Sequence, residues 1–263
     1  MNRIVIATLF ASAAALAQGP GGPGPGHFGD MRVMGMGGMR PGQVVAGAPF
    51  SAQQVTTETQ TLANGTHITN TITSQFYRDA SGRTRVERTF SKVGPVSTTG
   101  QPKTVVEIFD PIAGARYFLN PAAQTGEKET VTPRTPGTGA PKIARTGNPQ
   151  ATTSSLGSQT IQGLNVTGTL TTRVIPAGQM GNDQAITVTD ERWYSPDLQM
   201  AVMTKHNDPR SGEIDFTLQN VSRTAPDASL FAPPSSYAIT AVTGHGRGAM
   251  MHAAPPPPPG AEQ

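Results

Sequence analysis

The chain has 263 residues, contains no cysteine and carries a formal net charge of +3 at pH 7. The absence of cysteine excludes disulfides and thiol chemistry, and so small a net charge does not supply the concentrated basic face that nucleic-acid binding needs. Because the chain has 30 glycines and 24 prolines but only 5% aromatic residues, part of it is expected to be unstructured.

The first 17 residues have the pattern of a secretory signal peptide. Arg3 precedes an apolar run from Ile4 to Leu16, and Ala15 and Ala17 occupy the −3 and −1 positions of a cleavage site. The run is too short to span a bilayer, and no later segment is long and apolar enough to do so. The sequence therefore predicts a secreted protein, in the bacterial periplasm or at the cell surface, without a transmembrane segment.

Three later segments have the composition of disordered chain. Residues 18–50 are rich in Gly, Pro and Met and show no period that would bury one face. Residues 244–263 include five consecutive prolines, Pro255–Pro259, which are expected to form an extended polyproline spacer. Between these tails, residues 51–243 are predicted to form a β domain with a flexible Pro/Gly-rich break at 132–155. Whether the halves around this break form one sheet or two stays open.

Both halves show the period of two that is typical of β-strands. In Thr66–Tyr77 the apolar residues Ile68, Ile72 and Phe76 alternate with polar ones, and Asn64-Gly65 before them suits a two-residue hairpin turn. Further strands are expected at 83–90, 105–109 and 116–119, and between 164 and 219. Strands that are apolar on one side and polar on the other are typical of antiparallel sheets.

We therefore expect a mainly β fold: a curved antiparallel sheet or half-open β-barrel with few short helices, one of them a helical turn at Pro226–Phe231. The loop from Asn207 to Gly212 is interpreted as a turn between two strands. Trp193 and Tyr194, the aromatic pair at the end of a strand, are interpreted as a structural corner.

No catalytic or metal-binding signature is present, and the protein is predicted not to be an enzyme, with no cofactor and no metal site. His67 and His206 lie on predicted strands and are expected to have structural roles. Glu213 and Asp215 are spaced as a solvated strand face. An enzyme would need a constellation that spacing cannot show, such as His206 with Asp208 and Ser195.

The two tails carry a weaker alternative. His27 lies near four methionines, and Met250, Met251 and His252 lie near the other end; the four are Met31, Met34, Met36 and Met39. Thioether and imidazole groups suit Cu(I). Weak Cu(I) binding is therefore a hypothesis beside the alternative that the methionines reflect only the composition of a disordered segment.

Several phrases of the chain resemble a group of uncharacterised secreted bacterial proteins, among them YRDASGRTRVERTF, VEIFDPIAGARYFLNP and PDASLFAPPSSY. More distantly, the succession of amphipathic strands and the final phrase, with Asp227, Leu230, Phe231 and Tyr237, is similar to the LolA-like lipoprotein-carrier superfamily. The resemblance implies a half-open β-barrel that holds acyl chains against an apolar concave sheet.

The sequence thus predicts a binding protein whose ligand is an acyl chain or a lipidated partner, with an unknown oligomeric state. The predicted ligand-binding residues are the alternating apolar positions of the second half, which could equally form a packed core: Val166, Leu170, Ile186, Val188, Met200, Val202, Ile214, Phe216 and Leu218. An alternative is an envelope structural or interaction module that binds no small ligand and is spaced from the cell surface by its proline tail.

Overall fold

The structure of the protein is a computed structural model that describes residues 43–90, 92–93, 96–97, 103–133 and 151–242. The predicted signal peptide, the methionine cluster and the proline tail lie outside these residues. So does most of the segment 18–50.

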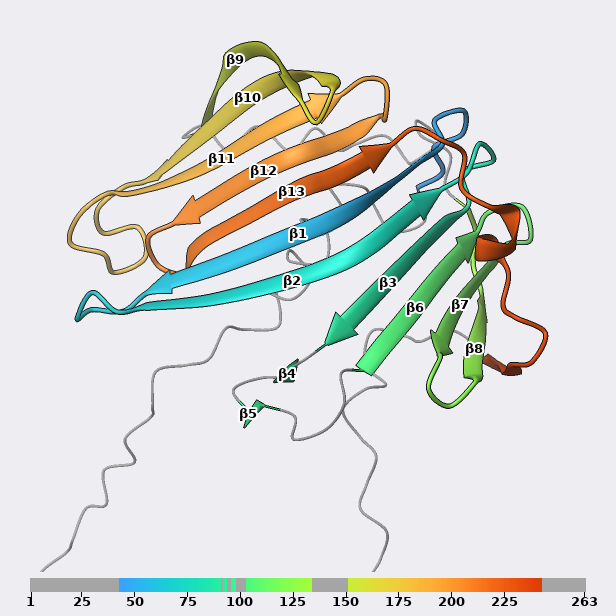
Figure 1. The fold of residues 1–263 in the computed structure, drawn as a ribbon. Coiled ribbons are helices and arrows are strands. Elements are labelled where there is room, and N and C mark those ends of the chain that lie inside the picture. The colour runs from blue at the N-terminus through green and yellow to red at the C-terminus, as the bar shows by residue number, and fades with distance from the viewer. Residues whose placement is uncertain (1–42, 91, 94–95, 98–102, 134–150, 243–263) are drawn as a thin grey trace, which may run out of the picture.

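The described chain forms one open sheet of twelve strands, and Figure 1 shows how the strands follow one another across it. The two sequence halves, whose relation the sequence left open, therefore belong to a single sheet. The first half contributes a meander of β2 (His67–Arg78), β3 (Thr84–Phe90), β6 (Lys103–Asp110), β7 (Ala115–Asn120) and β8 (Thr125–Thr130). The second half contributes β9 (Ala151–Ile161), β10 (Leu164–Ile175), β11 (Ile186–Ser195), β12 (Met200–Asp208) and β13 (Gly212–Ser222).

The strand β1 (Phe50–Thr61) joins these two meanders, because it pairs antiparallel with β2 on one side and with β13 on the other. All neighbouring strands are antiparallel except the last pair, in which β14 (Ala238–Val242) lies parallel to β8. A separate two-stranded ladder consists of β4 (Lys92–Val93) and β5 (Val96–Ser97). The predominance of antiparallel strands confirms the predicted fold class.

Three boundaries differ from the sequence prediction. The turn between β1 and β2 spans residues 62–66 instead of Asn64-Gly65 alone, since Thr61 and His67 form the last strand pair. The strand β9 begins at Ala151, inside the predicted flexible break at 132–155. The packed domain also begins before residue 50, because Val45 and Ala48 are buried in the core.

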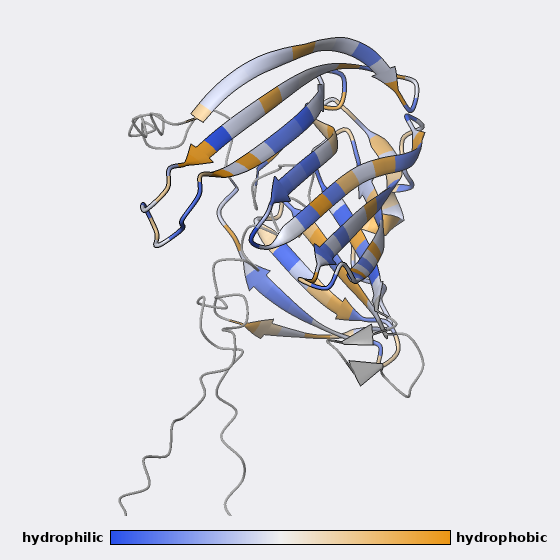
Figure 2. Ribbon diagram, turned by 90° about the vertical axis from the view of Figure 1, so that its left-hand side faces the viewer, coloured by the Kyte–Doolittle hydropathy of each residue, from blue (hydrophilic) through white to orange (hydrophobic). Residues whose placement is uncertain are grey.

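The sheet arches, as Figure 2 shows from one side, and its strands carry apolar and polar residues in alternation. Irregular pairing occurs at three places: between β1 and β13, between β10 and β9, and between β11 and β12. Extra residues of this kind bend a strand and increase its twist. At the third place Met200, Ala201 and Val202 are all buried, so the predicted strict alternation is interrupted there.

The main core is a cluster of buried side chains from β1, β2, β3 and β10–β13, together with the loops that precede β1 and β12. Phe50 and Phe76 stack within it, with ring centroids 5.2 Å apart. The side chain of Arg78 is buried in the same region. Its Nε donates to the carbonyl of Ala48 and its Nη2 to that of Leu198, while the guanidinium lies 4.8 Å from the Phe50 ring centroid.

A smaller cluster of Val106, Ile108 and Leu119 lies on the opposite face of the sheet. The C-terminal segment covers this region: the 3-10 helix η1 (Ala228–Phe231) contacts β3 and β6, and the carbonyl of Leu230 accepts from Arg85. The predicted helical turn at Pro226–Phe231 is therefore confirmed over its last four residues.

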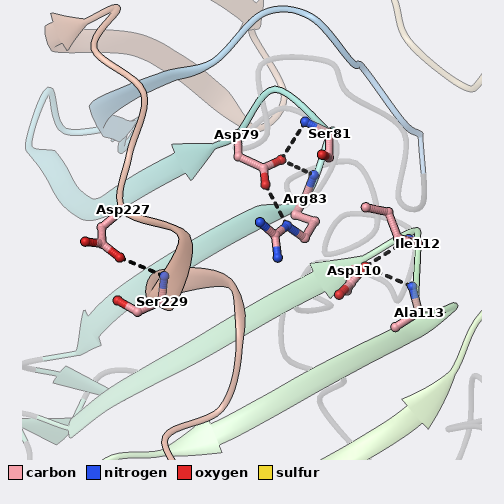
Figure 3. A network of polar contacts seen from close by, with 8 residues as sticks. All are labelled: Asp79, Ser81, Arg83, Asp110, Ile112, Ala113, Asp227 and Ser229. Atoms are coloured by element: carbon pink, nitrogen blue, oxygen red, sulfur yellow. Dashed lines mark hydrogen bonds and ion pairs between the residues drawn. The ribbon is translucent and has the colours of Figure 1, made fainter.

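Aspartates fix three of the turns, as Figure 3 shows. The carboxylates of Asp79, Asp110 and Asp227 each accept a hydrogen bond from the backbone N–H two residues later. Asp79 also accepts from Arg83 Nε at 2.6 Å. In such Asx turns the side chain accepts a hydrogen bond from the backbone and stabilises the reversal of the chain. The three carboxylates therefore have a structural role.

Candidate functional site

One face of the central strands carries most of the main core, and we call it the core face. On β1, β2 and β13 it includes Phe50, Ala52, Phe76, Phe216 and Leu218. The register places these residues together, because Ala52 pairs with Phe76 and Gln54 pairs with both Ser74 and Leu218. Side chains of directly paired residues lie on the same side of a sheet. The core face is therefore continuous across the junction of the two meanders.

The core face continues into exposed apolar side chains. Ile72 pairs with Thr56, which pairs with Phe216, so Ile72 lies in the same row as a fully buried phenylalanine. Ile68 lies four residues earlier on the same strand face. Ile72 is 41% exposed and Ile68 is 44% exposed. Apolar side chains, interspersed with Thr56 and Asn70, thus continue past the packed cluster to a part of the sheet that no described residue covers fully.

A third exposed residue lies on the same side of the sheet, with Arg88 of β3 between it and β2. Ser74 of the core face pairs with Arg88, and Arg88 pairs with Val105, which is 39% exposed. We call Ile68, Ile72 and Val105 together the exposed apolar patch. Isolated exposed apolar residues are ordinary, but residues that extend a buried apolar face are typical of interaction sites.

The nine predicted ligand-binding residues are mostly buried. Leu170 and Ile186 are half-buried. The other seven are no more than 7% exposed, and five of these belong to the main core: Val166, Met200, Val202, Phe216 and Leu218. These five are packed against other side chains of the core.

The register also divides the predicted set between the two faces of the sheet. Leu170 pairs with Glu191, whereas Val188 pairs with Arg173, which lies three positions after Leu170 on β10. Because side chains alternate along a strand, Leu170 and Val188 point to opposite sides. Ile68 and Ile72 were recognised from the sequence as one strand face but were not included in the predicted site. The alternation of apolar and polar residues that identified the nine predicted residues also identifies Ile68 and Ile72.

The polar residues considered for catalysis are not brought together. His206 Nδ1 lies 2.6 Å from Asp190 Oδ1, whereas the carboxylate of Asp208 binds Arg210. The hydroxyl of Ser195 accepts from the backbone N–H of Leu198. Lys205 bridges Glu213 and Asp215 on a partly exposed face. Within the described ranges, no three His, Cys, Asp or Glu side chains are grouped as a metal site would require.

The His206–Asp190 pair makes a pH-dependent contribution to stability. The hydrogen bond to Asp190 raises the pKa of His206 above its usual value, and the charge of Asp190 adds to this, while partial burial opposes it. A raised folded-state pKa gives stability that is complete below about pH 6.5, the pKa in the unfolded chain, and is lost as the pH rises through the folded-state pKa.

Replacing Asp190 with asparagine is therefore expected to destabilise the protein more at pH 5.5 than at pH 8.5. The effect should stay below about 1 kcal/mol because Asp190 is half exposed to solvent. Urea unfolding at both pH values, with an NMR titration of the His206 imidazole, measures it. An equal loss at both pH values would show that the charged pair is not its cause.

The aromatic corner at the end of β11 is structural, as predicted. The indole N–H of Trp193 donates to Glu191 at 2.6 Å, and the ring is buried in the main core. The ring lies flat over Gly168, where an added Cβ would lie 2.7 Å from ring carbons. The ring therefore needs glycine at this point of β10.

Comparison with known proteins gives likeness in structure only. No protein-family model matches the chain. No curated protein matches it either. Among solved structures it is similar to an uncharacterised conserved protein from Thermus thermophilus, with 10% identity, a TM-score of 0.39, and coverage of 74% of this chain and 91% of that chain.

Two further similar structures have names that refer to lipoproteins. One is lipoprotein LppX from Mycobacterium tuberculosis, with 13% identity, a TM-score of 0.31, and coverage of 78% of this chain and 99% of that chain. The other is a putative outer membrane lipoprotein-sorting protein domain from Vibrio parahaemolyticus, with 9% identity, a TM-score of 0.28, and coverage of 70% and 89%. Within the described residues no helix has the length and apolar character needed to cross a bilayer.

Proposed function

We propose that the protein is a secreted binding protein that holds an acyl chain, either free or on a lipidated partner, against the core face of its sheet. The observation that carries this proposal is the exposed apolar patch of Ile68, Ile72 and Val105, which extends the buried core face. In this arrangement the buried members of the predicted set, such as Phe216 and Leu218, form the floor beneath the ligand.

The energetics fit a chain of methylene groups. Burying apolar surface contributes roughly 25 cal/mol per Å², or about 0.8 kcal/mol per methylene group. Two isoleucines and a valine that keep about two fifths of their surface exposed therefore offer contact area without unfolding any part of the core. An alkyl chain needs no hydrogen-bonding partners along its length, so it suits the aliphatic side chains of the exposed apolar patch.

Binding of cis-parinaric acid, a fluorescent fatty acid, tests the proposal. The wild-type protein is expected to enhance the probe's fluorescence with saturation. Replacing both Ile68 and Ile72 with serine should weaken the affinity at least about tenfold, because the lost apolar contact is worth about 1.4 kcal/mol or more.

Ile112→Ser is the matched control, because Ile112 is 72% exposed in the turn after β6 and lies outside the patch. Its affinity for cis-parinaric acid should equal that of the wild type. Equal weakening in the control, or the absence of saturable binding to wild-type protein, would contradict the proposal.

A further inference from the structure

The sheet has two edges, and they are unlike. At one edge β14 is five residues long and lies beside β8. At the other edge β9 is eleven residues long, and its only described strand neighbour is β10. Every residue of β9 from Ala151 to Thr160 is exposed. An edge strand presents backbone N–H and C=O groups along its outer side, which can pair with another strand.

Proteins usually protect such an edge with charge, proline, very short strands, a bulge or a covering segment. The β9 sequence, ATTSSLGSQTI, contains no charged residue and no proline. Its single irregularity is at Leu156, which is left out of the pairing with β10 where Gly157 has a φ of +81°. This bulge divides β9 into two short arms, 151–155 and 157–161, and both arms remain extended and polar.

We propose that β9 is a pairing surface for a second copy of this chain, with the two β9 strands antiparallel about a two-fold axis near Leu156. A two-fold interface requires a surface that complements itself. Here the arm 151–155 of one copy would lie opposite the arm 157–161 of the other, and both arms are uncharged, with the sequences Ala-Thr-Thr-Ser-Ser and Gly-Ser-Gln-Thr-Ile. Cross-strand pairs of Thr and Ser are favourable in antiparallel sheets.

The distribution of charge favours a second copy over a different protein. The two outermost strands, β9 and β10, carry one charged side chain, that of Arg173, and it pairs with Ala151 at one end of β9. Antiparallel self-pairing would place the two copies of Arg173 at opposite ends of the junction, roughly 30 Å apart at about 3.3 Å per residue. No like charges would therefore meet, and apart from Arg173 neither strand carries a charged group that could select a partner of opposite charge.

Sedimentation velocity of the full chain across a wide range of concentration tests this proposal. The wild type is expected to change from monomer to dimer with concentration. The variant Ser154→Lys with Ser158→Lys is expected to remain monomeric, as is the variant Ser154→Glu with Ser158→Glu, because each places like charges opposite one another. An equimolar mixture of the two should form a heterodimer.

The control places two lysines on an interior strand, at Thr69 and Thr71 of β2. Both are exposed and pair with β1, and five strands separate β2 from β9. This variant should dimerise like the wild type, and far-ultraviolet dichroism should show all variants folded. A wild type that stays monomeric, a lysine variant at 154 and 158 that still dimerises, or a mixture that stays monomeric would each overturn the proposal. Dimerisation through β9 does not depend on acyl-chain binding, so either proposal can fail without the other.

Discussion

Replacing Gly212 with alanine is expected to destabilise the protein by about 3 kcal/mol. Gly212 begins β13 with a φ of +104°, a conformation that side chains other than glycine rarely adopt. A Cβ at this position would also overlap the carbonyl oxygen of Thr59 in the neighbouring strand β1. The conformation costs roughly 1–2 kcal/mol and the overlap roughly 1–3 kcal/mol.

Thermal unfolding measures this prediction, with a fall in Tm of about 6–12 °C for a chain of this size. Gly178→Ala is the matched control, because Gly178 has a φ of +80° but nothing lies within 4 Å of the added Cβ. Gly178→Ala should lower the free energy of unfolding only by the cost of the backbone conformation, about 1–2 kcal/mol. Equal losses in both variants would show that the contact with Thr59 does not matter.

Replacing Arg78 with leucine is expected to destabilise the protein by roughly 2–4 kcal/mol. Arg78 is fully buried, and it donates two hydrogen bonds to backbone carbonyls in the loops before β1 and β12. Each carbonyl left without a donor costs about 1–3 kcal/mol, partly offset because a buried cation is removed. Burial lowers the pKa of Arg78 to about 10, so the side chain is charged at neutral pH.

Two further variants separate the causes. Arg78→Lys keeps the positive charge, but the lysine ammonium group lacks the planar guanidinium that donates to both carbonyls. This variant should therefore lose nearly as much stability as Arg78→Leu. Arg192→Leu removes an exposed arginine that lies over the Tyr194 ring, and it should change stability by less than about 1 kcal/mol. Urea unfolding measures all three. An Arg78→Leu variant as stable as the wild type would contradict the role of the two carbonyl contacts.

The strands that the sequence predicted are those whose two sides differ in polarity. The strands β2, β10 and β13 carry their isoleucine, valine, leucine and phenylalanine residues mostly on one side, and the structure has all three near the expected positions. The strand β1 was missed because Gln, Thr and Glu occupy most of both sides. The strands β8 and β9 were missed for the same reason, since neither carries an apolar side that could reveal it.

The site could be predicted only in part, because alternation identifies an apolar side of a strand but not what covers it. Ile72 and Phe216 have the same sequence signature, yet one is 41% exposed and the other is buried. The difference depends on where each residue lies along the curved sheet relative to the loops. The irregular pairing at β12, which turns Ala201 inward beside Met200 and Val202, likewise has no signal in the local sequence.

Mass spectrometry of lipids extracted from the full chain, purified from its native cells, tests the proposed function most directly. The account predicts that acyl-chain compounds accompany the folded wild-type protein and the Ile112→Ser variant. It also predicts that they are depleted when Ile68 and Ile72 are both serine. Folded wild-type protein that carries no acyl-chain compound would contradict the account.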